Sequence, residues 1–396
     1  MSHRSRTLQV GISLFFGVVA TAPLGCGSSG QDGPAAASGG VGGGGGAAMG
    51  GGAGSAGAAG GGGADGGADG GAAGMAGMGG TGGADGGAAG TSGAGGSGGS
   101  EAIVDPALDG PFTTAELDAN TTVASTGHAV PIHCVVPTGG PGAGPYPIVV
   151  FAHGFQIPAS QYYGYIRKLG GFGYVALTAD FPAGLLSVDN VANAKDLLGA
   201  LDWAIAQSAD GGSPLSGKVD PALVGMSGHS LGGKLSLLAA TLDPRVKASI
   251  TLDPVDTSAQ GCAPANCPDV SASMSSLAIP TAFVGETTDA TGTFQACAPA
   301  ADNYATFYAN AKPPSLEVTV QGANHMSFVD DPVSCGLVCS LCKPATAPHD
   351  QVIGLSYAYV VAFYERYLRG QAGYDDYLTG PTAQARYAGL AAIESK

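Results

Sequence analysis

Residues 222–240 read ALVGMSGHSLGGKLSLLAA, and this stretch decides the fold. Its start, Ala222–Met226, has the length and apolar character of a buried strand, and its end, Lys234–Ala240, has helical composition. Between them, Gly228–Gly233 places a serine on a sharp turn, which needs glycine on both sides because side chains there would clash with backbone. The pattern predicts that the Ser230 hydroxyl stands above a sheet as a nucleophile. The alternative is a glycine-rich turn with an inert serine.

Apolar runs of strand length alternate with stretches of helical period along the chain around this turn. We expect strands at 129–136, 148–152, 174–178, 248–252, 281–284 and 316–320, and helices at 161–169, 191–206 and 352–368, with a short helix around Thr114–Asp118. Such alternation predicts an α/β fold with a mostly parallel sheet and helices on both faces. Catalytic groups in these sheets lie at the carboxyl ends of the strands.

A serine hydroxyl needs an adjacent base to act as a nucleophile near neutral pH. His325 is the strongest candidate, because it lies just beyond the expected strand 316–320 and comes last in the order serine, acid, histidine. The alternative is a histidine on a surface loop. The acid that would orient the imidazole is open at this point, since Asp253 directly follows one strand and Asp289 comes shortly after the next. The weaker candidates for the acid are Asp256 and Glu286.

Two backbone N–H groups are candidates for stabilising an oxyanion. The Leu231 N–H lies at the start of a helix, and the Phe155 N–H follows His153-Gly154 at the end of the first buried strand. We interpret His153 as a structural hydrogen-bonding residue and not as a proton carrier. The residues that we expect to line an apolar cleft are Phe155, Gln156, Tyr162 and Tyr163, with ordinary packing as the alternative.

The front of the chain has the features of an export signal followed by a tether. Residues 1–25 combine a positive start with the apolar run Leu8–Ala22, and an uncleaved membrane anchor is the alternative. Leu24-Gly25-Cys26 resembles the bacterial lipobox, which implies that Cys26 carries a lipid. Half of the 70 glycines lie between residues 31 and 100, so we expect 26–100 to be a disordered Gly/Ala linker. The remainder, 101–396, is long enough for one catalytic domain.

Charge and cysteine content restrict the partners and the compartment. The net charge of −15, from 15 basic and 30 acidic residues, argues against nucleic-acid binding. Seven cysteines remain after Cys26, and an exported chain favours disulfides with at least one free thiol. Cys262 and Cys267 are close enough to close a small loop, while the pairing of the other cysteines is open. The cluster Cys335–Cys342 also has zinc as an alternative to disulfides.

Several segments together resemble the chlorophyllase-like branch of the α/β hydrolases. The matching segments are Ile148–Phe155, Gly228–Lys234, Leu252–Asp256, Cys297–Pro299 and Asn324–Asp331. This resemblance implies an α/β-hydrolase fold with Ser230 as nucleophile, His325 as base and Asp253 as acid.

A second set of segments is similar to the bacterial cutinase and polyester-hydrolase family. This set consists of Leu198–Trp203, the turn around Ser230, Ile279–Asp289, Gly322–His325 and Ala362–Tyr377. It implies the same nucleophile and base but Asp289 as the acid. We favour Asp253, because the whole segment Leu252–Asp256 matches the first family.

These observations predict an exported serine carboxylic-ester hydrolase that forms an acyl-enzyme, with no metal or organic cofactor. We expect a monomer that acts on a small or polymeric ester and is held at an outer membrane or cell surface by a lipid on Cys26, or is otherwise periplasmic or secreted. A non-catalytic surface-binding lipoprotein on the same scaffold is one alternative. An amide or peptide hydrolase with the same triad is another.

Overall fold

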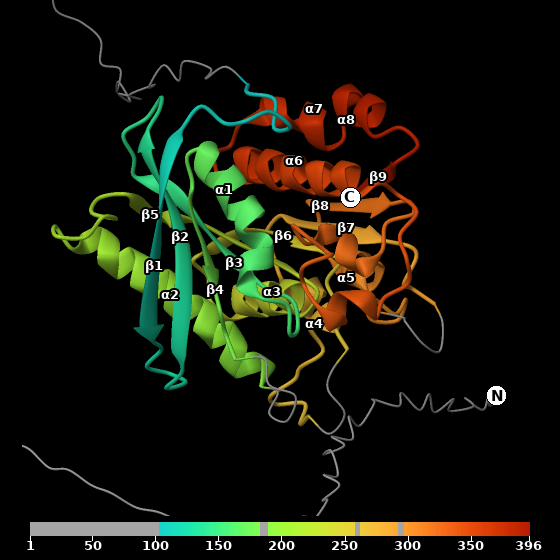
Figure 1. Ribbon diagram of the computed structural model, residues 1–396, viewed down its shortest axis with the longest axis horizontal. Coiled ribbons are helices and arrows are strands. Elements are labelled where there is room, and N and C mark those ends of the chain that lie inside the picture. Colours follow the sequence, from blue (N-terminus) through green and yellow to red (C-terminus); the bar gives the residue numbers. More distant parts are fainter. Residues whose placement is uncertain (1–102, 183–188, 258–261, 292–296) are drawn as a thin grey trace, which may run out of the picture. The chain divides into compact units, whose positions relative to one another are not determined.

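The computed structural model describes residues 103–182, 189–257, 262–291 and 297–396 (Figure 1). The predicted signal at 1–25, Cys26 and the predicted linker at 26–100 lie outside the described residues. The described residues belong to one compact unit, which spans 98–396. Within the described residues, no helix has the length and apolar character needed to cross a membrane.

A mixed sheet of nine strands forms the centre of the domain (Figure 1). Its strand order is β1-β2-β4-β3-β5-β6-β7-β8-β9, in which the six strands from β4 to β8 pair in parallel and the outer pairs are antiparallel. The strands are β1 (Thr113–Thr122), β2 (Ala129–Gly139), β3 (Tyr146–Ala152), β4 (Val175–Ala179), β5 (Val219–His229), β6 (Val246–Leu252), β7 (Thr281–Glu286), β8 (Ser315–Val320) and β9 (Ala391–Ser395).

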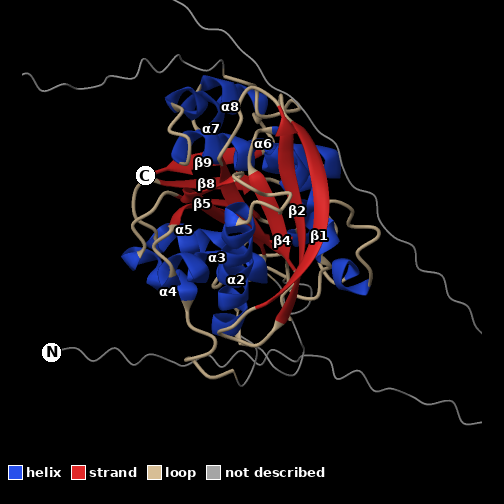
Figure 2. Ribbon diagram, turned by 90° about the vertical axis from the view of Figure 1, so that its left-hand side faces the viewer, coloured by secondary structure: helices blue, strands red, loops and turns tan. Residues whose placement is uncertain are grey.

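Helices cover both faces of this sheet (Figure 2). Apolar residues of α1 and α6 join one hydrophobic core, and those of α2, α3 and α5 join the other. The helices are α1 (Tyr163–Gly171), α2 (Asn190–Ala209), α3 (Leu231–Leu242), α4 (Val270–Ser273), α5 (Tyr304–Asn310), α6 (His349–Tyr367), α7 (Asp375–Leu378) and α8 (Pro381–Arg386). The central strands β3, β4 and β7 are buried along their whole length, as expected for parallel strands covered by helices on both faces. The predicted α/β-hydrolase architecture is confirmed.

The expected helix around Thr114–Asp118 is wrong. These residues belong to β1, which pairs antiparallel with β2 from Thr113 to Thr122. β-branched threonines favour a strand, and Leu117 and Ala119 alternate inward onto one of the two cores. Pairing with β2, the next strand along the chain, therefore overrides the local helical appearance. The edge strand β9 was not predicted, because its five residues carry too little pattern.

Six cysteines in the described part of the chain form pairs at disulfide distance. The pairs are Cys262–Cys267, Cys297–Cys342 and Cys335–Cys339. The cluster Cys335–Cys342 is thus engaged in disulfides, which leaves none of its thiolates for zinc. Cys134 is the free cysteine of the described residues, and burial in β2 raises the pKa of its thiol to about 12.

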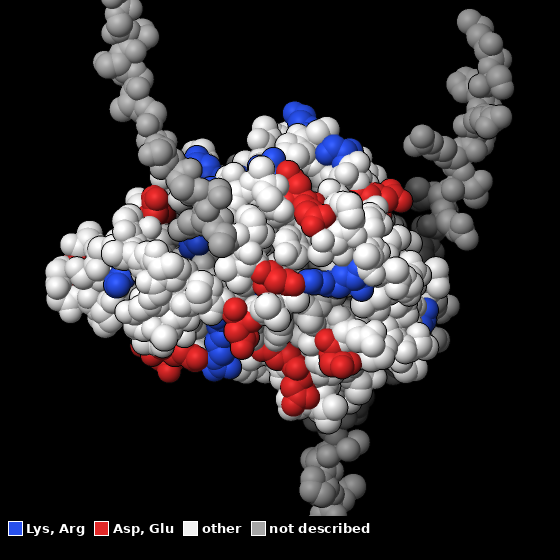
Figure 3. All heavy atoms as spheres, turned by 90° about the horizontal axis from the view of Figure 1, so that it is seen from above, with Lys and Arg blue, Asp and Glu red and all other residues white. Residues whose placement is uncertain are grey.

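Charged side chains of both signs are interspersed on the face that carries α6, α7 and α8 (Figure 3). Arg366 pairs with Asp375 there, and Arg386 pairs with Asp105. Among the described residues on this face, lysine and arginine gather into no extended basic area.

Candidate active site

Ser230 lies on the sharp turn between β5 and α3. Its φ of 56° and ψ of −124° place it in a conformation that non-glycine residues rarely adopt. The turn is packed so closely that a Cβ atom on Gly228 would overlap the backbone of Gly232, and one on Gly232 would overlap the backbone of Ala152. The Ser230 N–H donates to the Leu252 carbonyl at 3.0 Å, which ties the turn to the end of β6.

His325 begins a single 3-10 turn, His325–Phe328, a short distance after β8 ends. Its Nε2 lies 2.8 Å from the Ser230 Oγ. A capping box between Asn324 and Ser327 holds the start of the turn, since each side chain accepts from the backbone N–H of the other residue. The side chain is only 3 % exposed, so the imidazole is fixed in place by its surroundings.

Asp253 directly follows β6, and its carboxylate meets the other side of the same ring. Its Oδ2 lies 2.5 Å from the His325 Nδ1, and the side chain is fully buried. The residue has a φ of 40°, and its N–H donates to the Val284 carbonyl at 2.6 Å. Burial raises the pKa of Asp253, whereas the hydrogen bond from His325 opposes that rise. Ser230, His325 and Asp253 therefore form one continuous hydrogen-bonded row.

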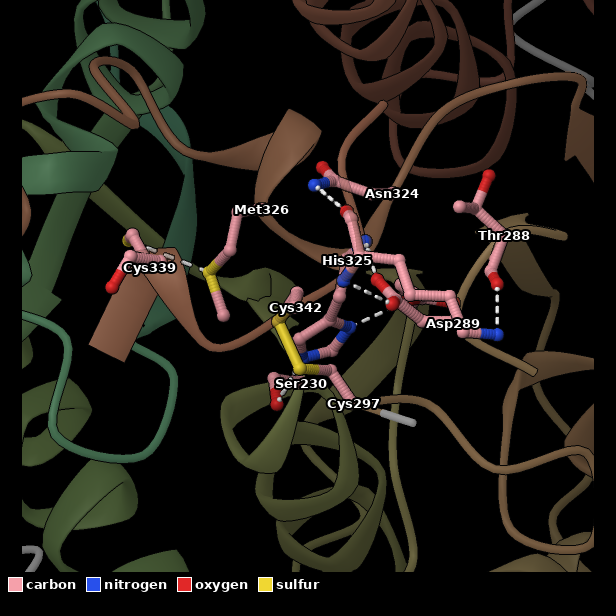
Figure 4. Close-up of a disulfide and its surroundings, with 12 residues drawn as sticks. Ser230, Thr288, Asp289, Cys297, Asn324, His325, Met326, Cys339 and Cys342 are labelled. Carbon is pink, nitrogen blue, oxygen red and sulfur yellow. Dashed lines mark hydrogen bonds and ion pairs between the residues drawn. A yellow bond between two sulfur atoms is a disulfide. The ribbon is translucent and has the colours of Figure 1, made fainter. Parts of the chain in front are cut away.

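Asp289 also contacts His325, but through the backbone (Figure 4). Its Oδ2 accepts from the His325 N–H at 2.8 Å, and its Oδ1 accepts from the Lys343 N–H at 2.8 Å. The disulfide Cys297–Cys342 lies beside this contact and joins the two loops involved. The two candidate acids thus have separate positions, with Asp253 on the ring and Asp289 on the main chain.

The weaker candidates for the acid hold neighbouring loops. Glu286 ends β7 and accepts from the N–H groups of Thr288 and Asp289. Burial and the nearby charge of Asp253 raise the pKa of Glu286 to about 8. Asp256 pairs with the buried Lys234 at 2.9 Å. Among the described contacts of the His325 ring, neither Glu286 nor Asp256 is a partner.

The two candidate oxyanion donors have their N–H groups available. Leu231 is the first residue of α3, and the first N–H groups of a helix have no acceptor within it. Within the described residues, no hydrogen-bond acceptor is in place for the N–H of Leu231 or of Phe155. Gln156, next to Phe155, has a φ of 55°. It joins Ser230 and Asp253 as the three non-glycine residues of positive φ in the described chain, so backbone strain is concentrated at this site.

His153 lies in the loop after β3 and is held on several sides. Its ring stacks on Phe181 with centroids 3.9 Å apart, its Nε2 is 3.3 Å from Asp180, and its Nδ1 is 2.9 Å from the Gly154 carbonyl. The side chain is 3 % exposed.

The two tyrosines expected to line a cleft differ in their burial. Tyr162 is fully buried, and its hydroxyl contacts the Gly154 N–H and His229. Tyr163 stacks on His133 of β2, with ring centroids 3.9 Å apart. The cleft expectation is therefore wrong for Tyr162, because its ring is fully buried, whereas for the half-buried Tyr163 it stays a prediction. Sequence reasoning also gave His229 no role, since a histidine inside the turn carries no spacing signal of its own.

The sheet order, the strained serine on its turn and the histidine beyond β8 define an α/β hydrolase. The sequence profile of the Chlorophyllase family matches residues 106–384, which is more than half of the chain. The chain belongs to the Chlorophyllase family.

Two characterised relatives support an ester hydrolase. The chain is 26 % identical over 265 residues to Chlorophyllase-1 of Arabidopsis thaliana, covering 62 % of this chain and 79 % of that protein. It is 29 % identical over 148 residues to bis(hydroxyethyl) terephthalate hydrolase of Streptomyces coelicolor, covering 37 % of this chain and 44 % of that protein. The two families that the sequence resembles are therefore both represented, and the predicted resemblance is confirmed.

Proposed function

We propose that this protein is a serine carboxylic-ester hydrolase that acts through an acyl-enzyme. The observation that carries the proposal is the row of contacts from the Ser230 Oγ through the His325 ring to the Asp253 carboxylate, at 2.8 and 2.5 Å. Its nucleophile lies in the strained conformation typical of a turn that exposes a serine hydroxyl. Family membership supports the ester as the bond that is cleaved.

In the first half of the reaction, the Ser230 Oγ attacks the ester carbonyl carbon while the His325 Nε2 takes the hydroxyl proton. The Asp253 carboxylate holds the Nδ1–H and stabilises the imidazolium. The N–H groups of Phe155 and Leu231 donate to the oxyanion of the tetrahedral intermediate. His325 then gives its proton to the departing alkoxide, so the alcohol leaves and the acyl group stays on Ser230.

In the second half, water replaces the alcohol. The His325 Nε2 takes a proton from the water as its oxygen attacks the acyl carbon, and the same two N–H groups hold the second oxyanion. The proton returns to the Ser230 oxygen as the acid product is released. No step requires a metal ion or an organic cofactor.

The substitution Ser230→Ala tests the proposal on p-nitrophenyl butyrate. We expect hydrolysis to fall to background, because the residual rate from the oxyanion donors alone is small. Ser249→Ala is the matched control, since it removes a buried serine hydroxyl that bonds the Met226 carbonyl in the next strand. A fluorophosphonate probe should label the wild type and the control but not Ser230→Ala. Retained turnover in Ser230→Ala would end the proposal.

The class of substrate is tested with a panel of matched compounds. Esters of aliphatic and aromatic acids, including bis(hydroxyethyl) terephthalate, are compared with the corresponding anilides. We expect the esters to be cleaved and the anilides not. Faster cleavage of the anilides would favour an amide hydrolase, and absence of both activities together with absence of fluorophosphonate labelling would favour a non-catalytic binding protein.

We also propose that the protein is exported and anchored by a lipid on Cys26. The support is the lipobox-like Leu24-Gly25-Cys26 behind an apolar run, together with cysteine pairs of a kind that persists in oxidising compartments. Metabolic labelling with palmitate in a bacterial host should mark the wild type, and Cys26→Ala should abolish the label. An unlabelled wild type would contradict the anchor.

A further inference from the structure

A row of three buried hydrogen bonds runs behind Ser230 from Gly154 to His325. The Gly154 N–H lies 3.2 Å from the Tyr162 hydroxyl, which lies 2.8 Å from the His229 Nδ1. The His229 Nε2 in turn lies 2.9 Å from the His325 carbonyl oxygen. The side chains of Tyr162 and His229 are both fully buried. The row thus connects the loop after β3 to the turn that carries His325, through the last residue of β5.

The two ends of this row fix the direction of its two outer bonds. A backbone N–H can only donate, so the Tyr162 oxygen accepts from Gly154. A backbone carbonyl can only accept, so the His229 Nε2 carries a proton that it donates to His325. A neutral imidazole with its proton on Nε2 leaves Nδ1 free to accept from the Tyr162 hydroxyl. This state makes all three bonds and also uses the Tyr162 hydroxyl proton, which an imidazolium would leave without an acceptor in the row.

Both ends of the row are next to groups that the proposed function uses. Gly154 precedes Phe155, whose N–H is one of the two oxyanion donors, and the carbonyl at the other end belongs to the general base itself. We propose that Tyr162 and His229 are positioning residues, which hold the oxyanion donor of the β3 loop and the general base at a fixed spacing around Ser230. This inference rests on the proposed function, because it gives the row a role in the same reaction.

A neutral His229 ring is compatible with the positive charge that His325 acquires during the proposed reaction. Its ring centroid is 4.5 Å from that of His325, which becomes positively charged during the reaction. Burial and the neighbouring His325 hold the pKa of His229 well below its ordinary value. A second positive charge at this distance would oppose formation of the imidazolium, whereas a neutral ring can hold the main chain of His325 without that cost.

Three variants test the row by steady-state kinetics on p-nitrophenyl butyrate. Tyr162→Phe removes one hydroxyl, and His229→Leu removes both polar atoms of the ring. We expect each to lower kcat by about 10- to 100-fold with KM changed less than about threefold, because a misplaced catalytic group affects the transition state most. The double variant should lose no more than the worse single variant, since either change breaks the same row.

A conservative variant and a matched control distinguish a loss of catalytic positioning from a general loss of protein stability. His229→Gln keeps one donor and one acceptor, so it should recover at least about tenfold of the kcat lost in His229→Leu. Tyr359→Phe removes the hydroxyl of another fully buried tyrosine, which bonds the Leu378 carbonyl at the end of α7 and is not part of the row. This control should keep its kcat within about twofold. Equal kcat losses in Tyr162→Phe and Tyr359→Phe, or no recovery in His229→Gln, would overturn the inference.

Two further measurements keep this inference distinct from the proposed function. The rate of fluorophosphonate labelling should fall in Tyr162→Phe but not in Tyr359→Phe, while a wild type that is neither labelled nor active would overturn the proposed function. Nitrogen-15 spectra of the imidazoles need no substrate, and they should show His229 neutral with its proton on Nε2 at pH 6. A protonated Nδ1 in those spectra would overturn the row even if the enzyme hydrolyses esters.

Discussion

Replacing each candidate acid by its amide distinguishes the roles of the two carboxylates that contact His325. Asp253→Asn acts on the ring, because the Asp253 Oδ2 accepts from the His325 Nδ1 at 2.5 Å. The neutral amide either presents its NH2 group to Nδ1, which favours the wrong tautomer, or keeps the bond but loses the charge that stabilises the imidazolium. We expect kcat to fall by about 10⁴-fold, as it does in other triads, which corresponds to about 5 kcal/mol of transition-state stabilisation.

Asp289→Asn acts on the main chain instead. Its two oxygens each accept from one N–H, that of His325 and that of Lys343, both at 2.8 Å. The amide keeps an oxygen for one N–H and turns its NH2 group toward the other, so one charge-assisted bond is lost, at a cost of about 1.5–3 kcal/mol of stability. The melting temperature should fall by roughly 2–5 °C for a domain of this size, while kcat stays within about tenfold of the wild type.

The assay combines kcat and KM on p-nitrophenyl butyrate with thermal unfolding of the same preparations. Circular dichroism of both variants at the assay temperature verifies that each is folded. The reasoning fails if Asp289→Asn loses more kcat than Asp253→Asn. It also fails if Asp253→Asn retains kcat within about tenfold of the wild type.

Three further predictions concern the pH dependence of stability, a disulfide and the turn that carries Ser230. The pKa of Glu286 is raised from 4.5 to about 8, so the folded protein holds a proton that the unfolded chain releases. The free energy of unfolding should therefore fall as pH rises through this range, by up to about 1.4 kcal/mol per pH unit. Urea unfolding of Glu286→Gln should show a weaker pH dependence than that of the wild type. Replacing Cys297 and Cys342 by serine opens a loop with a sequence separation of 45. The free energy of unfolding should fall by on the order of 4 kcal/mol, from the chain entropy that the disulfide removes from the unfolded state. An unchanged urea midpoint under oxidising conditions would contradict this. Gly232→Ala forces a methyl group into the backbone at the end of β3. Both fluorophosphonate labelling and ester hydrolysis should therefore fall by at least about tenfold. Normal labelling would contradict this, because it would mean that the turn can shift to make room for the methyl group.

Local patterns predicted most of the elements that surround the nucleophile. The strand before Ser230 and the helix after it are visible because steric demands require glycines at fixed positions and apolar runs on both sides. The outer strands were harder to predict. Thr114–Asp118 looks helical by itself, and it becomes a strand through pairing with β2, the next strand along the chain. The edge strand β9 depends in the same way on β8.

The position of the acid shows why the site could be predicted only in part. Strands β6 and β7 are parallel neighbours, and Leu252 pairs with Val284, so residues that follow either strand arrive at the same edge of the sheet. Both Asp253 and Asp289 therefore come within reach of His325, and strand order alone does not say which one meets the ring. The difference depends on the φ of 40° at Asp253 and on the bonds that hold Asp289 to two backbone N–H groups.

By itself, the sequence determined the class of fold, the serine on its turn and the candidate histidine, because these follow from short patterns with strict steric or chemical requirements. The tertiary structure decided which carboxylate faces the imidazole, which cysteines pair, and that Tyr162 is buried against His229. Apart from the two short disulfide loops, these features join residues tens of positions apart, and their distances depend on strand pairing and loop packing. No local pattern encodes such contacts, because each requires the whole sheet to be assembled first.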